Sequence, residues 1–132
     1  MTRTLKITVT SHRPQADICA STVVRKLEQN YDSNKAAIVS EMFGKDIRST
    51  KAGSATYDIG EASVRFDIQD ILKKDDLQKI LTYVCSAARQ EISKSTGGLS
   101  VTVSLTKIRY EKSTGVREAS TDTLSCGVEL DA

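Results

Sequence analysis

The chain has 132 residues, of which 39% are hydrophobic and 27% charged, and its formal net charge is +2. This length suits one domain, and the apolar content can build one core, which argues against a second domain and against global disorder. The charge alone does not imply a polyanionic partner, because domains that bind nucleic acid usually carry a clear basic excess.

The number and spacing of the cysteines indicate the redox environment of the protein. Cys19, Cys85 and Cys126 are odd in number and far apart, whereas small secreted domains usually carry paired cysteines. We therefore expect reduced thiols, with Cys85 and Cys126 as small core residues, and a cytoplasmic location. No apolar leader opens the chain and no apolar run approaches the roughly 20 residues of a spanning helix, so no membrane segment is predicted.

The first third of the chain predicts one strand and two helices. Residues 4–10 alternate apolar and polar side chains, the pattern of a strand with one buried face. Pro14, the only proline, then suits the first turn of a helix. Apolar residues recur at helical spacing and predict helices over about 15–30 and 34–43, the second ending at Gly44.

A loop and a hairpin are expected next. Residues 45–56 are mostly small, polar and basic, which predicts a mobile loop. Apolar residues alternate on both sides of Gly60-Glu61, and a two-residue turn there places Tyr57 opposite Val64.

A long amphipathic helix is the strongest prediction from the sequence. Apolar residues from Leu77 to Ile92 follow the i, i+3, i+4, i+7 spacing, with Leu81 and Val84 at the centre of the buried face. The acidic pair Asp75-Asp76 precedes them, as the helix dipole favours, and Gly97-Gly98 are expected to end the helix.

The end of the chain predicts a second hairpin. Residues 99–105 and 124–130 alternate apolar with small or polar side chains, so both are expected to be strands. Ser113-Thr114-Gly115 suits a three-residue loop whose glycine adopts a positive φ.

These elements together predict the fold class. The order β-α-α-β-β-α-β-β indicates one α+β domain over residues 1–132, with a mainly antiparallel sheet and the helices packed on one of its faces. The order of the strands in the sheet does not follow from the sequence.

No catalytic or metal-binding motif is apparent. His12 is the only histidine, which excludes sites that need two, and we expect it at the surface or capping a turn, with ligand contact as the alternative. Gly44-Lys45 lacks the spacing of a phosphate loop, and the acidic pairs, Asp75-Asp76 among them, look exposed. The sequence therefore predicts no enzyme, no cofactor and no metal.

Two functional hypotheses remain. The first is a small accessory or assembly protein that acts through self-association and a protein partner, as is typical of viral or phage accessory proteins and adaptors. The second is an RNA- or DNA-binding protein that contacts the phosphate backbone through basic residues and the 45–51 loop. The candidate contacts of the second hypothesis are Arg13, Arg25, Lys26, Lys45, Arg48 and Lys51.

A change of phase in the fourth expected strand suggests where self-association occurs. The apolar residues from Leu99 to Leu105 are odd-numbered, whereas Ile108 and Tyr110 are even-numbered. Either a bulge near Thr106-Lys107 returns both side chains to the core, or they form an exposed apolar patch. The second alternative predicts a homodimer with Ile108 and Tyr110 at or beside its interface.

Overall fold

A computed structural model describes residues 2–12, 20–25, 49–58, 60–68, 72–92, 97–110, 112–115 and 117–129. It contains strands β1 (Thr2–Ser11), β2 (Ser49–Asp58), β3 (Glu61–Ile68), β4 (Leu99–Tyr110) and β5 (Arg117–Val128), and helix α3 (Lys74–Arg89). Residues 20–25 are also helical and fall within the helix predicted over 15–30. The α+β class is confirmed, and the described elements follow the predicted order. The helix predicted over 34–43 lies outside the described residues.

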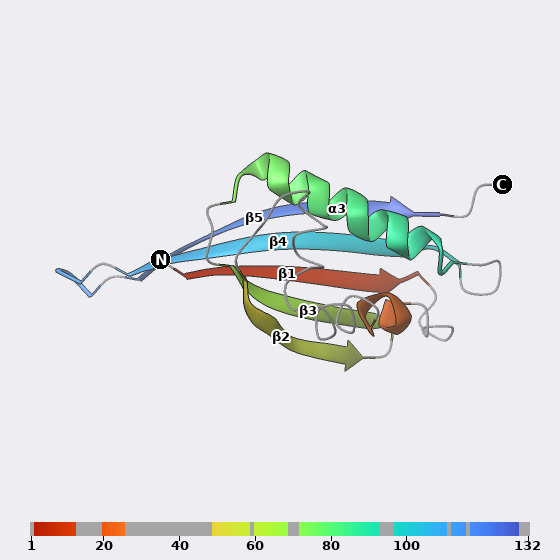
Figure 1. The fold of residues 1–132 in the computed structure, drawn as a ribbon, viewed down its shortest axis with the longest axis horizontal. Coiled ribbons are helices and arrows are strands. Elements are labelled where there is room, and N and C mark those ends of the chain that lie inside the picture. The colour runs from red at the N-terminus through yellow and green to blue at the C-terminus, as the bar shows by residue number, and fades with distance from the viewer. Residues whose placement is uncertain are drawn as a thin grey trace.

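The strands form one antiparallel sheet in the order β2-β3-β1-β4-β5 (Figure 1). The N-terminal strand β1 lies at the centre, where Leu5 pairs with Phe66 of β3 and with Leu105 of β4. The edges of the sheet are β2 and β5.

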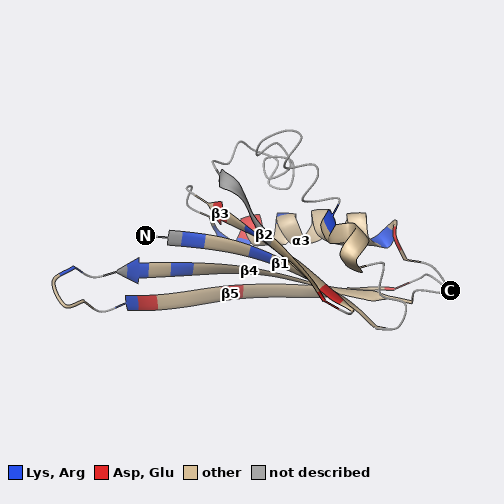
Figure 2. Ribbon diagram, turned by 90° about the horizontal axis from the view of Figure 1, so that it is seen from below, with Lys and Arg blue, Asp and Glu red and all other residues tan. Residues whose placement is uncertain are grey.

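The core lies between one face of the sheet and the helices. Alternate residues of β1, β3 and β4 point to this face, and α3 contacts β4 and β5 (Figure 2). No described helix covers the opposite face of the sheet, which we call the bare face. Leu81 and Val84 of α3 are buried as predicted, with 5% and 0% of their surface exposed. The helical residues Ala20, Val23 and Val24 belong to the same core.

The two ends of α3 differ from the sequence prediction. Asp76 is buried and accepts a hydrogen bond of 2.9 Å from the Lys73 backbone N–H, so it is not part of an exposed acidic pair. The helix ends at Arg89 with Gln90 as C-cap, well before Gly97. The expectation that Gly97-Gly98 end the helix is therefore wrong, and the positive φ of Gly97 belongs to the segment that enters β4.

The prediction of a loop over residues 45–56 is wrong from Ser49 onward, because β2 runs from Ser49 to Asp58. An edge strand needs only backbone hydrogen bonds along one side, so small polar residues can form it without an apolar stripe. The hairpin to β3 is confirmed, but Tyr57 pairs with Ala62 instead of Val64, and the turn comes one residue earlier than expected.

The β4–β5 hairpin is regular along its whole length. Pairing runs from Leu99 with Val128 to Tyr110 with Arg117 without a register shift, so the alternative of a bulge near Thr106-Lys107 is wrong. The connection spans residues 111–116 and is longer than the expected three residues, although Gly115 has the predicted positive φ of 69°.

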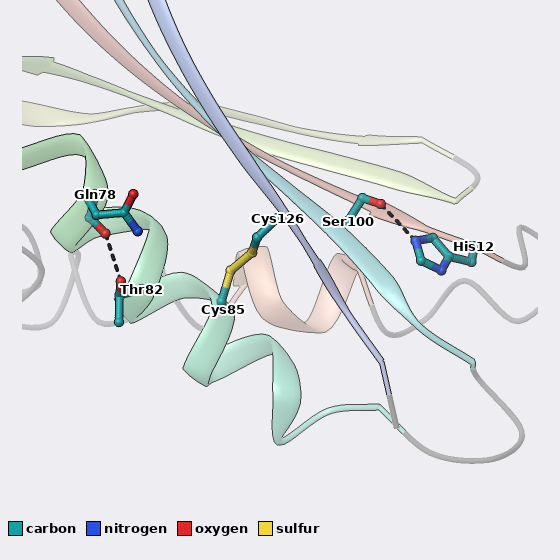
Figure 3. The surroundings of a disulfide bond; sticks show 6 residues. All are labelled: His12, Gln78, Thr82, Cys85, Ser100 and Cys126. Carbon is teal, nitrogen blue, oxygen red and sulfur yellow. Dashed lines mark hydrogen bonds between the residues drawn. A yellow bond between two sulfur atoms is a disulfide. The ribbon is translucent and has the colours of Figure 1, made fainter. Parts of the chain in front are cut away.

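Cys85 of α3 and Cys126 of β5 form a disulfide bond (Figure 3). The expectation of two separate core thiols is therefore wrong. Sequence alone does not reveal the pair, because 41 residues separate the two cysteines and each sits in its own apolar stripe. Disulfides persist mainly in oxidising compartments, so this bond counts against the cytoplasmic location, which stays a prediction.

Candidate functional site

The two edges of the sheet differ in regularity. On β2 the pairing register shifts between Ser49 and Ala52 and again between Ala52 and Ala55. Irregularities of this kind are a common way to protect an edge from further pairing. The edge strand β5 has 12 residues, no register shift and an exposed surface over most of its length. It therefore offers a long, regular set of backbone groups.

The register identifies which backbone groups of β5 face away from the sheet. The His12 N–H donates to the Gly98 carbonyl at 3.1 Å, and the Ser11 N–H donates to the Gly60 carbonyl at 2.7 Å. Even-numbered residues of β1 therefore hydrogen-bond to even-numbered residues of β4. The odd-numbered residues of β4 then hydrogen-bond to β5, and because the register is unbroken, their partners are the even-numbered residues of β5. Odd-numbered residues such as Thr121 and Thr123 direct their N–H and C=O groups outward.

The bare face of the sheet is rich in hydroxyl side chains. On β4 and β5, Thr106 and Thr121 are cross-strand partners whose hydroxyl oxygens lie 3.1 Å apart. Ile108 lies on this face, half-buried, opposite Ala119. Ile108 therefore lies on the Ser/Thr face, as the second alternative requires, but it is half-buried and forms no exposed patch among the described residues. The side chain of Tyr110 lies outside the described part of the chain.

Basic residues gather at the hairpin end of the sheet (Figure 2). Arg3 of β1 pairs with Lys107 of β4, and Arg109 follows on the same face, opposite Glu118 of β5. Lys107, Arg109 and Glu118 also line an open groove of about 390 Å³. The groove faces the same side of the sheet as α3, beyond the part of the sheet that the helix contacts.

Of the nucleic-acid contacts predicted from the sequence, Arg25 is the one whose side chain the structure describes. Arg25 lies with its guanidinium carbon 5.1 Å from the centre of the Tyr57 ring. Lys51 belongs to β2, but its side chain lies outside the description, as do Arg13, Lys26, Lys45 and Arg48 in full.

A polar cluster forms where β1, β4 and β5 end on the side away from the long hairpin. His12 Nε2 lies 2.8 Å from the Ser100 hydroxyl oxygen, and His12 Nδ1 lies 3.0 Å from Glu129 Oε1 (Figure 3 shows the first contact). The side chains of His12 and Glu129 are 38% and 66% exposed, so solvent reaches the cluster. His12 therefore lies at the surface as expected, whereas ligand contact, the alternative, stays a prediction.

Gly98 makes the contact between His12 and Glu129 possible. Gly98 immediately precedes β4, and in the register of the sheet it lies between His12 and Glu129. A Cβ atom at this position would come within 2.5 Å of Glu129 Oε2. Sequence reasoning missed this cluster because 88 residues separate His12 from Ser100, and only the strand order brings them together.

A shallow groove of about 290 Å³ lies beside the disulfide. Its lining includes Gln78, Thr82 and Arg89 of α3 and Gly127 of β5. The Thr82 hydroxyl donates to the Gln78 carbonyl at 2.9 Å, so it is engaged within its own helix. We assign no ligand to this groove.

Among the described residues, no group of three or more His, Cys, Asp or Glu side chains is arranged to hold a metal ion. No described helix is long and apolar enough to cross a membrane. Comparison with known proteins gives no family model, no curated protein and no solved structure that matches the chain.

Proposed function

We propose that the protein is a self-associating assembly protein in which a second copy adds to the β5 edge. The observation that supports the proposal most directly is the contrast between the interrupted β2 edge and the regular 12-residue β5 edge. A long unprotected edge is a template for pairing, and an antiparallel pair of identical strands satisfies a two-fold axis. The product is one continuous sheet across both subunits.

The charges of β5 favour one register for this pairing. If Thr123 lies on the two-fold axis, Thr121 faces the partner's Ser125, and Arg117 faces the partner's Glu129. Hydroxyl pairs and opposite charges are favourable across antiparallel strands. A register centred on Asp122 would instead set two like charges against each other, which is unfavourable. We therefore place the axis at Thr123.

Ile108 has a place beside this interface. It neighbours Ala119 on the bare face of the sheet, and in the proposed register Ala119 faces the partner's Gly127. The absence of a side chain there leaves room for Ile108 and Ala119 to contact the partner's sheet. This arrangement develops the prediction of Ile108 and Tyr110 at or beside the dimer interface.

The disulfide supports the same proposal. It attaches β5 to α3 through Cys126, so the edge strand is fixed to the core as well as to β4. A fixed edge loses less conformational entropy on association than a mobile one.

Thr123→Pro is expected to weaken self-association without unfolding the subunit. Proline removes an N–H that points outward, so the bonds to β4 remain, whereas in the dimer two hydrogen bonds at the axis are lost. At about 0.5–1.5 kcal/mol per bond, the dissociation constant should rise roughly 5- to 150-fold. Light scattering over a dilution series measures this shift.

The matched control is Ala55→Pro, which removes an outward N–H from the β2 edge. It should leave the dimer unchanged. A monomeric wild type would disprove the proposal, as would a folded Thr123→Pro variant that dimerises as tightly as the wild type.

The basic cluster at the hairpin end supports a second candidate function, binding to the phosphate backbone of nucleic acid. Lys107 and Arg109 line the groove of about 390 Å³, and Arg3 pairs with Lys107 across the strands. Several Lys and Arg side chains on one face are typical of a surface that binds phosphate groups. This cluster is a different candidate from the contacts named from the sequence, most of which lie outside the described residues.

Lys107→Ala/Arg109→Ala is the test of this second candidate. If both side chains contact phosphates, the slope of log K against log salt should become shallower by about 1.4–1.8. Fluorescence anisotropy with a labelled oligonucleotide pool gives the slope, and Lys74→Ala/Lys79→Ala on the exposed side of α3 is the control. Absence of binding at low salt, or equal loss in the control, would exclude the hairpin cluster as the site.

A further inference from the structure

We propose that Ser100 is an activated nucleophile toward carboxylic esters, with His12 as its general base and Glu129 as the residue that positions the imidazole. The proposal goes beyond self-association and does not depend on it. It rests on the order of contacts in one cluster: hydroxyl on Nε2 and carboxylate on Nδ1 of the same ring. That order of contacts is the arrangement by which serine nucleophiles are recognised on unrelated folds.

The carboxylate determines the direction of both hydrogen bonds. Glu129 can only accept, so neutral His12 carries its proton on Nδ1 and donates it to Oε1 across 3.0 Å. Nε2 is then the acceptor for the Ser100 hydroxyl proton at 2.8 Å. The base therefore already accepts a hydrogen bond from the hydroxyl whose proton it must remove.

Ser100 is half-buried, so part of its surface reaches solvent. Ser100 lies on the bare face of the sheet, and Gly98, which immediately precedes β4, contributes no side chain. Thr10 is the direct cross-strand partner of Ser100, and Thr102 follows it on the same face. These two residues bring hydroxyl groups, which can donate hydrogen bonds to a developing oxyanion.

The reaction follows from these positions. The Ser100 proton moves to His12 Nε2 while Oγ attacks the ester carbonyl carbon. The bond from that carbon to the alcohol oxygen then breaks, and the alcohol leaves with the proton from Nε2. Water repeats the sequence on the acyl-Ser100 ester, so the products are an alcohol and a carboxylic acid, with His12 and Ser100 restored.

The register directs the Ser100 backbone N–H toward β1, so it is engaged in the sheet and is no oxyanion donor. Stabilisation by hydroxyl groups alone should make turnover slow. Covalent capture of the serine is therefore a sharper measurement than steady-state hydrolysis.

The experiment treats the full chain with a fluorophosphonate probe and maps the adduct by mass spectrometry. The phosphorus is attacked by the serine oxygen and fluoride leaves, so the probe reports nucleophilicity directly. We expect one adduct at Ser100, none in Ser100→Ala, and a rate at least about 100-fold lower in His12→Gln, since general-base catalysis contributes typically 10²–10⁴-fold. Gly98→Ala should also slow labelling, because its Cβ displaces Glu129.

Ser104 is the internal control, because it lies on the same strand and the same face without a described histidine contact. Ser104→Ala should label at the wild-type rate, and Glu129→Gln should reduce the rate less than His12→Gln does. Circular dichroism confirms that each variant is folded. An unlabelled wild type, adducts spread over Ser100 and Ser104 alike, or full labelling of folded His12→Gln would each disprove the proposal.

Discussion

Val84→Asp is expected to unfold the domain or to lower its free energy of unfolding by about 4 kcal/mol or more. Val84 is fully buried in α3, against the apolar face of the sheet. The substitution removes apolar burial worth about 1.5–3 kcal/mol and adds a carboxylate without a partner, whose desolvation costs several more. The free energy of unfolding of such domains is about 5–15 kcal/mol, so the loss is a large part of the total.

Urea denaturation followed by circular dichroism measures the change. Gln78→Asp is the control, because Gln78 is exposed on the same helix and its replacement should cost less than about 1 kcal/mol. Equal midpoints for Val84→Asp and the wild type would show that α3 does not pack on the sheet through this face.

Removal of the disulfide by Cys85→Ser/Cys126→Ser is expected to lower the free energy of unfolding by about 2–4 kcal/mol. The bond joins positions 41 residues apart, so it restricts the unfolded chain considerably. It also joins α3 to the edge strand β5, which otherwise contacts the sheet along one side only.

Chemical denaturation with and without reducing agent tests this expectation. Reduction should bring the wild type to the stability of the double variant and leave the double variant unchanged. A thiol assay on the unfolded, unreduced wild type should find one free cysteine of the three, Cys19. Three free thiols would contradict the bond.

The parts of the fold that the sequence predicts well are those governed by local periodicity. The apolar spacing around Leu81 and Val84 and the alternation in β1 reflect burial on one face, and both are confirmed. Gly115 was likewise predictable, because its backbone conformation is one that few other residues adopt.

The sequence predictions are wrong where the local pattern of apolar residues does not reflect the position of the segment in the fold. β2 at the sheet edge needs no apolar stripe, so residues 49–56 resembled a loop. Ile108 is apolar yet lies on the hydroxyl-rich face, because the regular hairpin keeps the strand in phase. Cys85 and Cys126 looked like core thiols, since alternation indicates burial but not which distant element lies opposite.

The candidate sites depend on the order of the strands, which no local pattern contains. His12 follows β1 and Glu129 follows β5, and their side chains come into contact because β4 lies between these two strands. Gly98, which immediately precedes β4, has no side chain to separate them. The β5 edge is a candidate interface for the same reason, because nothing in residues 117–128 themselves indicates that this strand is outermost. The alternation of Ser and Thr predicted a solvent-facing side of the strands, but not which residues of different strands lie next to one another on it.

The central position of β1 has a consequence for how the chain folds. β1 is made before the other described strands and pairs with β4, so residues 12–98 must be synthesised before the middle of the sheet can close. Contacts between residues so distant in sequence make folding slow, because a long loop must be closed before any of them forms. Until then the edge of β1 that pairs with β4 stays unpaired on the ribosome, and this interval is when the nascent protein is most open to aggregation or to a chaperone.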